Sequence, residues 1–332
     1  MKKKILYSKK SSDYTSLSKQ KTNTKYAFSD SEYIRKVYLK QKKRALCKNC
    51  RKKISGYDIE VNKVKFKICK YCNHLNGIHE ETIDFFKKIY LENKGKNFTT
   101  GYQSSNYNQK VKCIYLPKIK FLKDIIGTKK ILDLGSGSGY FQAACEKLKI
   151  KCLGLEINET LVNYSKNKLK LNEVKLIKAN KINNFVLNHK YDCLSLINVL
   201  EHLLDPNEIF KYFKKSSAKY MFINVPLFSF RALVENAFIN NERKLLGGSH
   251  THLYTKESLE YLFKKNNLKI IGEWWYGLDF VDLGTNLKKI IKFEKKNVNS
   301  YEKFFGNLLD NFQSILDKNK LSSEVHYVLK KK

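Results

Sequence analysis

The sequence predicts an α/β protein in which helices cover both faces of a mostly parallel sheet, with a small cysteine-containing module before it. Three observations lead to this prediction. From Lys130 onward, short apolar runs alternate with segments whose apolar residues recur at helical spacing, the pattern of a parallel sheet with crossover helices. The first of these runs ends in a glycine-rich loop. Two Cys-x-x-Cys pairs lie upstream, between residues 47 and 72.

The elements of the predicted sheet follow one another in regular order. Each strand is a short apolar run, and each helix has apolar residues three or four positions apart. The helix before the first strand ends at Gly127, the residue type that most readily ends a helix. We expect strands near residues 131–134, 151–155, 174–179, 191–198, 220–225, 268–275 and 324–329, and helices near 83–90, 114–126, 141–148, 161–169, 209–213, 258–263 and 304–316.

Composition divides the chain into four regions. Residues 1–44 form a basic tail that we expect to be largely disordered, since it offers few apolar anchors. Residues 45–78 form the cysteine module, and residues 79–112 a linker that includes a helix. Residues 113–332 form the α/β domain, which carries a helical insertion at 276–320 before its last strand.

Charge is the most unusual property of the composition. The 332 residues include 65 Lys and Arg against 31 Asp and Glu, a formal net charge of +34. Only five of these cations are arginine, the side chain best suited to bidentate phosphate contacts. Half of the excess lies in residues 1–75. The charge permits a nucleic-acid partner but does not favour one, while the 42% hydrophobic content excludes a wholly disordered chain.

The chain shows no targeting or membrane signal. No apolar run approaches the roughly 18 residues of a membrane-spanning helix, and the apolar run at residues 5–7 is too short for a secretory signal. We therefore expect a cytoplasmic protein. In that compartment, paired cysteines bind metal more often than they form disulfides.

The spacing of the two Cys-x-x-Cys pairs, 18 residues apart, predicts a four-thiolate zinc site. A unit of ~34 residues has too small a core to fold alone, so the ion would supply folding energy. Four cysteines close the coordination sphere, and we therefore expect a structural zinc ribbon. His74 or His79 as substitute ligands, and a pair of redox-active dithiols, are less favoured alternatives. The expected ligands are Cys47, Cys50, Cys69 and Cys72.

The strongest chemical signal is the segment ILDLGSGSGYF at residues 131–141. Its glycines let the backbone turn sharply between a strand and a helix, whose free N–H groups can meet a ligand. Tyr140 occupies the position of the third glycine of a dinucleotide fingerprint, and the Gly-Lys-Ser/Thr of a P-loop is absent. Glu156 ends the next strand, where a carboxylate can accept both hydroxyls of a ribose. These features fit a ligand with a ribose and a cationic centre but no pyrophosphate, such as S-adenosylmethionine.

Three ordered motifs resemble those of the class I S-adenosylmethionine-dependent methyltransferases: LDLGSGSGYF at 132–141, GLEIN at 154–158 and YDCLSLINVLEHLLDP at 191–206. The resemblance covers roughly residues 113–275. It implies a Rossmann-like, seven-stranded, mostly parallel sheet with an antiparallel strand near one edge. Some methyltransferases of surface-glycan and related small-molecule pathways look similar, with a zinc ribbon ahead of this kind of domain.

The resemblance also implies the residues of the cofactor site. The glycine loop would lie under the methionine part, Asp133 would fix this loop, and Glu156 would hold the ribose. Asn180 stands where the family commonly has an acid that meets the adenine amine, which is a departure from the pattern. The residues assigned to the cofactor are Asp133, Gly135, Ser136, Gly137, Gly139, Glu156, Asn180 and Asn198.

The acceptor of the methyl group is less well defined by the sequence. A hydroxyl acceptor benefits from a nearby base, and His202, His250 and His252 follow predicted strands. For His202, a structural role in its loop is an equal alternative, and for His250 and His252 lining of the substrate pocket is favoured over proton transfer. We predict methylation, on oxygen, of a small metabolite or sugar, including a nucleotide-sugar. The oligomeric state is left open.

An RNA methyltransferase that binds RNA through its basic zinc ribbon is the alternative. Two absent motifs argue against it. The acidic/Asn-Pro-Pro-aromatic motif of enzymes that methylate amino groups of nucleic acids is replaced by residues 197–201, Ile-Asn-Val-Leu-Glu. The Pro-Cys nucleophile of cytosine C5 methylation is also missing, since Cys193 lies within a predicted strand.

Overall fold

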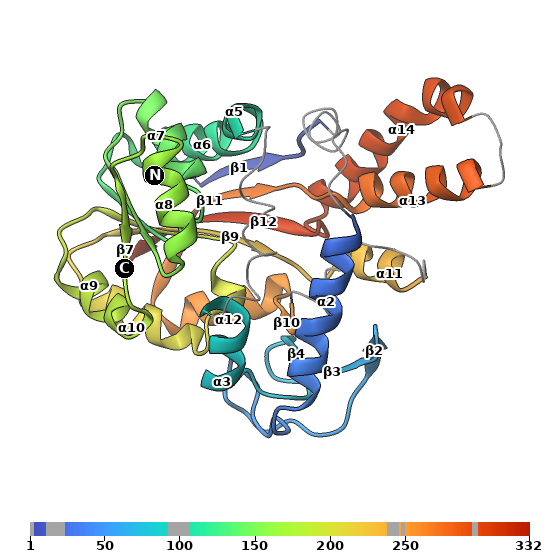
Figure 1. Ribbon diagram of the computed structural model, residues 1–332, viewed down its shortest axis with the longest axis horizontal. Helices are drawn as coiled ribbons and strands as arrows, with labels where there is room; N and C mark the ends of the chain where they lie inside the picture. The colour runs from blue at the N-terminus through green and yellow to red at the C-terminus, as the bar shows by residue number, and fades with distance from the viewer. Residues whose placement is uncertain (1–2, 11–23, 92–106, 238–245, 247–249, 294–297) are drawn as a thin grey trace.

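A computed structural model describes residues 3–10, 24–91, 107–237, 246, 250–293 and 298–332 (Figure 1). Parts of the expected tail and linker, at 11–23 and 92–106, therefore lie outside the described residues. The architecture is the predicted one, a mostly parallel α/β sheet covered by helices.

The main sheet has eight strands, one more than the expected seven. All run parallel except β12, which is antiparallel to both of its neighbours, β9 and β11. The adjacent strands β6, β5 and β8 are parallel, so their carboxyl ends meet at one edge of the sheet. In spatial order the strands are β1 (Lys4–Tyr7), β11 (Leu268–Trp275), β12 (Glu324–Lys331), β9 (Tyr220–Pro226), β8 (Cys193–Ile197), β5 (Ile131–Leu134), β6 (Cys152–Glu156) and β7 (Val174–Leu176).

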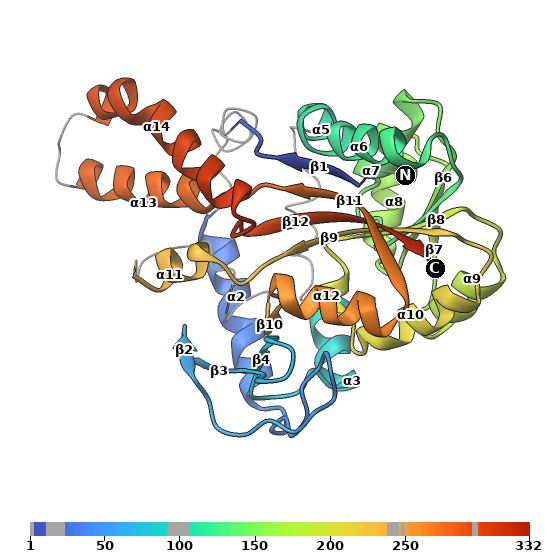
Figure 2. The same cartoon turned by 180° about the vertical axis from the view of Figure 1, so that it is seen from behind.

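Helices cover both faces of this sheet (Figures 1 and 2). Each face has its own buried apolar cluster, which explains why the strands are apolar on both sides. On one face lie α5 (Tyr107–Lys110), the π-helix η3 (Val111–Tyr115), α6 (Leu116–Ile126), α7 (Tyr140–Lys147) and α8 (Glu159–Asn167). On the other lie the 3-10 helix η4 (Ala179–Lys181), α9 (Ile182–Asn188), α10 (Pro206–Lys215) and α12 (Lys256–Lys265).

The N-terminal region differs from the disordered tail that the composition predicted. Residues Lys4–Tyr7 form β1, which pairs in parallel with β11 and covers the edge of the sheet. Helix α2 (Thr24–Leu39) places Ile34 and Tyr38 in an apolar cluster with residues of the cysteine module. Tertiary contacts thus order two segments of the region that its composition had marked as a disordered tail.

The cysteine module is joined to the α/β domain through a shared sheet. Strands β2 (Ile59–Val61), β3 (Val64–Ile68) and β4 (Leu75–Gly77) form an antiparallel sheet, and β10 (His252–Leu253) pairs with β4 as its fourth strand. The β2–β3 turn is tight because Asn62 and Lys63 both adopt positive φ, 56° and 65°. The module is followed by α3 (Ile83–Phe86) and the π-helix η1 (Lys87–Leu91).

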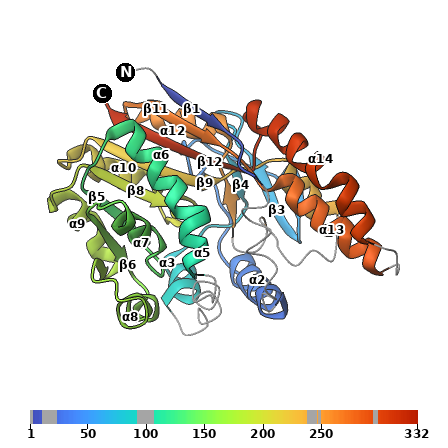
Figure 3. The ribbon, with the colours of Figure 1, turned by 90° about the horizontal axis from the view of Figure 1, so that it is seen from above.

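The 3-10 helix η5 (Leu200–His202) follows β8, and the remaining α-helices lie toward the β11–β12 end of the sheet. Helix α11 (Phe230–Ala237) follows β9, and α13 (Asp279–Phe293) and α14 (Val298–Lys318) connect β11 to β12. Figure 3 shows α13 and α14 at the opposite end of the molecule from α8. No helix in the described part of the chain combines the length and apolar character needed to cross a bilayer.

Candidate functional site

The glycine loop lies at the carboxyl end of β5, between that strand and α7. Gly135, Gly137 and Gly139 have φ of 66°, 56° and 74°, which L-residues adopt only under strain. A Cβ on Gly135 would lie 2.6 Å from Val199 Cγ2, so the residues that follow β8 pack directly on the loop. The close approach explains why a glycine is needed at this turn.

Glu156 holds the loop from the end of β6. Its Oε2 accepts a hydrogen bond from Gly137 N at 2.8 Å, and its Oε1 accepts from Ile157 N at 2.8 Å and Asn158 N at 2.9 Å. Burial raises the pKa of Glu156, although these backbone donors oppose the rise. A carboxylate has about four acceptor positions, and three of those of Glu156 are taken by these backbone donors, so about one remains for a ligand hydroxyl.

Asp133 lies beneath the loop within the sheet. Its carboxylate accepts hydrogen bonds from Ser195 Oγ and, at 2.9 Å, from Gln142 Nε2. Burial raises the pKa of Asp133 to about 7. The side chain thereby ties β5 to β8 and to α7, the three elements that position the loop.

The other predicted cofactor residues lie around the same edge. Ser136 is buried, and its hydroxyl has no hydrogen-bond partner among the described residues, so it is available to a ligand. Asn198 is exposed just after β8, with a φ of 53°. Asn180 is exposed in η4, beyond β7.

The four predicted zinc ligands form one buried cluster. Cys47 Sγ lies 3.7 Å from Cys72 Sγ, and Cys50 Sγ lies 3.5 Å from Cys69 Sγ. A tetrahedral ion with Zn–S bonds near 2.3 Å requires S···S separations of about 3.8 Å, whereas a disulfide requires about 2 Å. The cluster therefore fits a zinc ion and not two disulfides.

The histidines of this region are divided between two locations. His252 is fully buried at the joint with the cysteine module, where its Nδ1 lies 3.1 Å from His74 Nε2. His202 and His250 instead lie together at the end of β8, with ring centroids 5.1 Å apart and ring planes at 21°. The structure thus brings together two of the three histidines that the sequence singled out.

Glu201 completes the group around His202 and His250. Its Oε1 lies 4.0 Å from His202 Nε2 and 3.9 Å from His250 Nε2. Burial raises the pKa of Glu201 to about 8 and holds the pKa of His202 well below its usual value. The Tyr90 hydroxyl lies 2.9 Å from His202 Nδ1 on the side away from Glu201.

A small pocket adjoins this group, and part of its wall comes from the cysteine module. Lys48, from the first Cys-x-x-Cys pair, lines it together with Glu81, Tyr90, Glu201 and His202. Sequence reasoning singled out neither Lys48 nor Tyr90, because both belong to regions interpreted as a metal ribbon and a linker. Glu201 could have been found from its position next to His202 at the end of a predicted strand.

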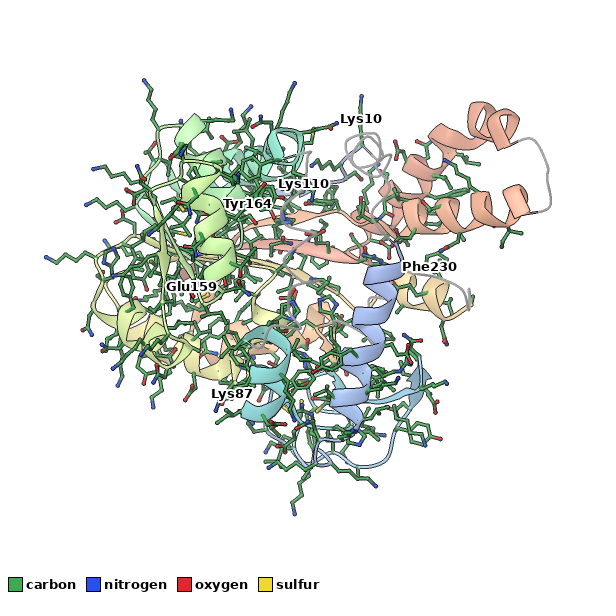
Figure 4. The ribbon with its side chains drawn as sticks, viewed as in Figure 1. Lys10, Lys87, Lys110, Glu159, Tyr164 and Phe230 are labelled. Carbon is green, nitrogen blue, oxygen red and sulfur yellow. The ribbon has the colours of Figure 1, made fainter. Side chains whose placement is uncertain are left out.

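The charged side chains of the described residues are spread over the surface, and the arginines among them are paired with carboxylates. Lysines such as Lys10 and Lys87 project from different parts of the surface (Figure 4). All four arginines in the described residues lie next to carboxylates: Arg35 by Glu32, Arg44 by Glu81, Arg51 by Asp205, and Arg231 by Glu235 and Asp282. The side chains best suited to phosphate recognition are therefore already paired.

Comparison with known proteins identifies the α/β domain. The family model described as "Methyltransferase domain" matches residues 107–273, just over half of the chain, and begins after the cysteine module. Among solved structures, a SAM-dependent methyltransferase from Archaeoglobus fulgidus is 17% identical, with 70% of this chain and 99% of that chain covered and a TM-score of 0.43. An S-adenosylmethionine-dependent methyltransferase from Clostridium acetobutylicum is 12% identical, with 70% and 98% covered and a TM-score of 0.43. No curated protein is significantly similar in sequence.

Proposed function

Since the chain belongs to the methyltransferase-domain family and is an S-adenosylmethionine-dependent methyltransferase, we propose that it methylates an oxygen of a small, hydroxyl-bearing metabolite such as a sugar or nucleotide-sugar. The observation that carries this proposal is the juxtaposition of the glycine loop with the group formed by the buried Glu201 and the half-buried His202 and His250. The loop offers a place for the methyl donor, and the group offers basic atoms for the acceptor.

The cofactor would lie across the carboxyl ends of β5, β6 and β8. Gly135, Ser136, Gly137 and Gly139 would contact the methionine part, where the free Ser136 hydroxyl offers a hydrogen bond. Glu156 would accept a ribose hydroxyl at its remaining acceptor position while its bond to Gly137 N keeps the loop in place. Asn180, beyond β7, would border the adenine, Asn198 would border the cofactor on the opposite side, at the end of β8, and Asp133 would act through the loop it supports.

The chemistry that the cofactor supplies is a methyl group on a positively charged sulfur. The chain has to hold the acceptor oxygen in line with the C–S bond and take up or stabilise the hydroxyl proton. The imidazoles of His202 and His250 lie at the end of β8, the strand next to the glycine loop, and provide the basic nitrogens. His252 would support this edge from the module side through its contact with His74.

The four-cysteine site would hold a structural zinc ion. The S···S separations match tetrahedral coordination, and four thiolates leave no open position for a substrate. The ion would stabilise the segment that carries Lys48 and so shape one wall of the acceptor pocket.

Cofactor binding can be tested at Glu156. Glu156→Gln should weaken S-adenosylmethionine binding at least about tenfold, because hydrogen bonds to a charged carboxylate are worth about 1.5–3 kcal/mol each. Isothermal titration calorimetry measures the change. Glu159→Gln is the matched control, since Glu159 is exposed on α8 (Figure 4) and should bind the cofactor normally. An unchanged affinity in Glu156→Gln would contradict the assignment.

The acceptor class can be tested by following the methyl label. Incubation with methyl-labelled S-adenosylmethionine and either nucleotide-sugars or total RNA should place the label in the small-molecule fraction as an alkali-stable methyl ether. Label recovered in RNA alone would overturn the proposed substrate class.

A further inference from the structure

We propose that Glu201, His202 and His250 bind a divalent metal cation, and that this cation binds adjacent oxygen atoms of the acceptor. The inference rests on the proposed function and deepens it. It changes the role of the two histidines from proton acceptors to metal ligands, and it narrows the acceptor to a molecule with neighbouring hydroxyls, such as a sugar diol.

The geometry of the three side chains fits a metal site. One donor atom from each lies within 4.8 Å of the other two, and the two nitrogen-to-Oε1 separations are 3.9 and 4.0 Å. These separations are too long for hydrogen bonds. Metal bonds of about 2.1 Å require ligand atoms about 3.0–3.4 Å apart, so small side-chain shifts would close the group around an ion.

Glu201 gives the second, independent observation. Its side chain is buried, yet neither carboxylate oxygen has a hydrogen-bond partner among the described residues. Two buried lysines lie nearby, but both have their own partners. Lys48 Nζ lies 3.1 Å from Glu81, and Lys118 Nζ is 2.5 Å from Asn224 Oδ1. A buried carboxylate without a partner is costly, and a bound cation would remove that cost.

Tyr90 orients one of the ligands. Its hydroxyl, 2.9 Å from His202 Nδ1, can hold the imidazole in the tautomer whose Nε2 lone pair points toward Glu201. Histidines that bind metals characteristically use their second nitrogen in this way, and this fixes the ring and the tautomer. Tyr90 is therefore a positioning residue of the inferred site.

The donor set and its location define the ligand class. Two imidazoles and one carboxylate suit divalent transition metals and leave coordination positions open for oxygen atoms from outside. Val199, two residues before Glu201, packs on Gly135 of the cofactor loop. A cation at this position would therefore hold the acceptor beside the methyl donor and lower the pKa of the hydroxyl to be methylated, so that its proton can pass to solvent water as the C–O bond forms and the C–S bond breaks.

Total bound metal tests the inference in the full-length protein, without cofactor or acceptor. The protein is equilibrated with Mn2+, which thiolates disfavour, and zinc plus manganese are counted by mass spectrometry and by electron paramagnetic resonance. Wild type should bind two metals per chain, whereas Glu201→Gln and His250→Ala should bind one. Tyr90→Phe should weaken the Mn2+ affinity about tenfold, because it removes the hydrogen bond that orients the metal-binding imidazole of His202.

Matched controls separate loss of the site from loss of the fold. Glu159→Gln and His189→Ala remove an exposed carboxylate and an exposed imidazole and should keep both metals. Without added Mn2+, Glu201→Gln should melt close to the wild-type temperature, since an uncharged amide of the same shape replaces a buried carboxyl group that has no hydrogen-bond partner among the described residues. One metal in wild type, or two in Glu201→Gln and His250→Ala, overturns the inference. Calorimetry with S-adenosylmethionine tests the proposed function separately from the metal site. If the protein binds the cofactor normally but binds no second metal, only the inferred metal site is refuted.

Discussion

Loss of the four-cysteine zinc site should abolish methyl transfer while leaving S-adenosylmethionine binding nearly unchanged. Structural zinc contributes about 10–16 kcal/mol to folding small modules of this kind, so Cys72→Ser should unfold the module. The module carries Lys48 into the wall of the pocket proposed for the acceptor, and its β4 pairs with β10, two residues beyond His250. The glycine loop and Glu156 are instead held by two large apolar clusters of the α/β domain. We therefore expect the loss of zinc to disrupt the acceptor side of the site and to leave the cofactor side intact.

The experiment compares zinc content, cofactor affinity by calorimetry and transfer of labelled methyl. Cys113→Ser is the matched control, because Cys113 is half-buried and lies outside the cysteine cluster. It should retain zinc and activity. Full methyl transfer by a Cys72→Ser protein that has lost its zinc would show that the module plays no part in the acceptor site.

Local signals explain what the sequence could predict of the fold. The strands around the glycine loop are apolar on both faces, and the loop itself needs residues that tolerate positive φ. Both features can be recognised from a few consecutive residues, as short apolar runs and as closely spaced glycines. Strand β1 cannot be recognised in this way, because its four residues are flanked by lysines and form a strand by pairing with the edge strand β11. The pairing joins residues more than 260 positions apart.

The sequence alone suggested all the residues proposed for the cofactor, but only the histidines of those proposed for the acceptor. Asp133, Glu156 and the glycines lie within 25 residues of one another, at strand ends that face the same edge. The acceptor half joins Lys48 and Tyr90 to Glu201 and His250, from segments that become neighbours only through the β4–β10 pairing. The same pairing explains His252, which faces His74 and not the pocket.

The buried ionic group around Glu81 gives the second large expected effect. Glu81 contacts both Arg44 and Lys48, accepts a hydrogen bond from Thr251, and like both cations is almost fully buried. Burial alone would raise the pKa of Glu81, but Lys48 and Arg44 hold it well below its usual value. Glu81→Gln would leave two buried cations without their partner. Removing one member of a buried pair costs about 3–5 kcal/mol, so we expect the melting temperature to fall by about 5–15 °C.

Thermal unfolding of three variants separates this charge effect from a simple loss of packing. Glu80→Gln, at the neighbouring half-exposed position 3.1 Å from Lys42, should cost less than about 1 kcal/mol. Lys48→Met in the Glu81→Gln background should recover part of the lost stability, since it removes one of the uncompensated cations and keeps the buried volume. If Lys48→Met instead lowers the melting temperature further, packing and not charge pairing dominates the stability of the contact between the cysteine module and the α/β domain. Glu81 contacts residues of both the cysteine module and the segment before β10. Recovery of stability in the double variant would therefore show that charge pairing stabilises the contact between these two walls of the proposed acceptor pocket.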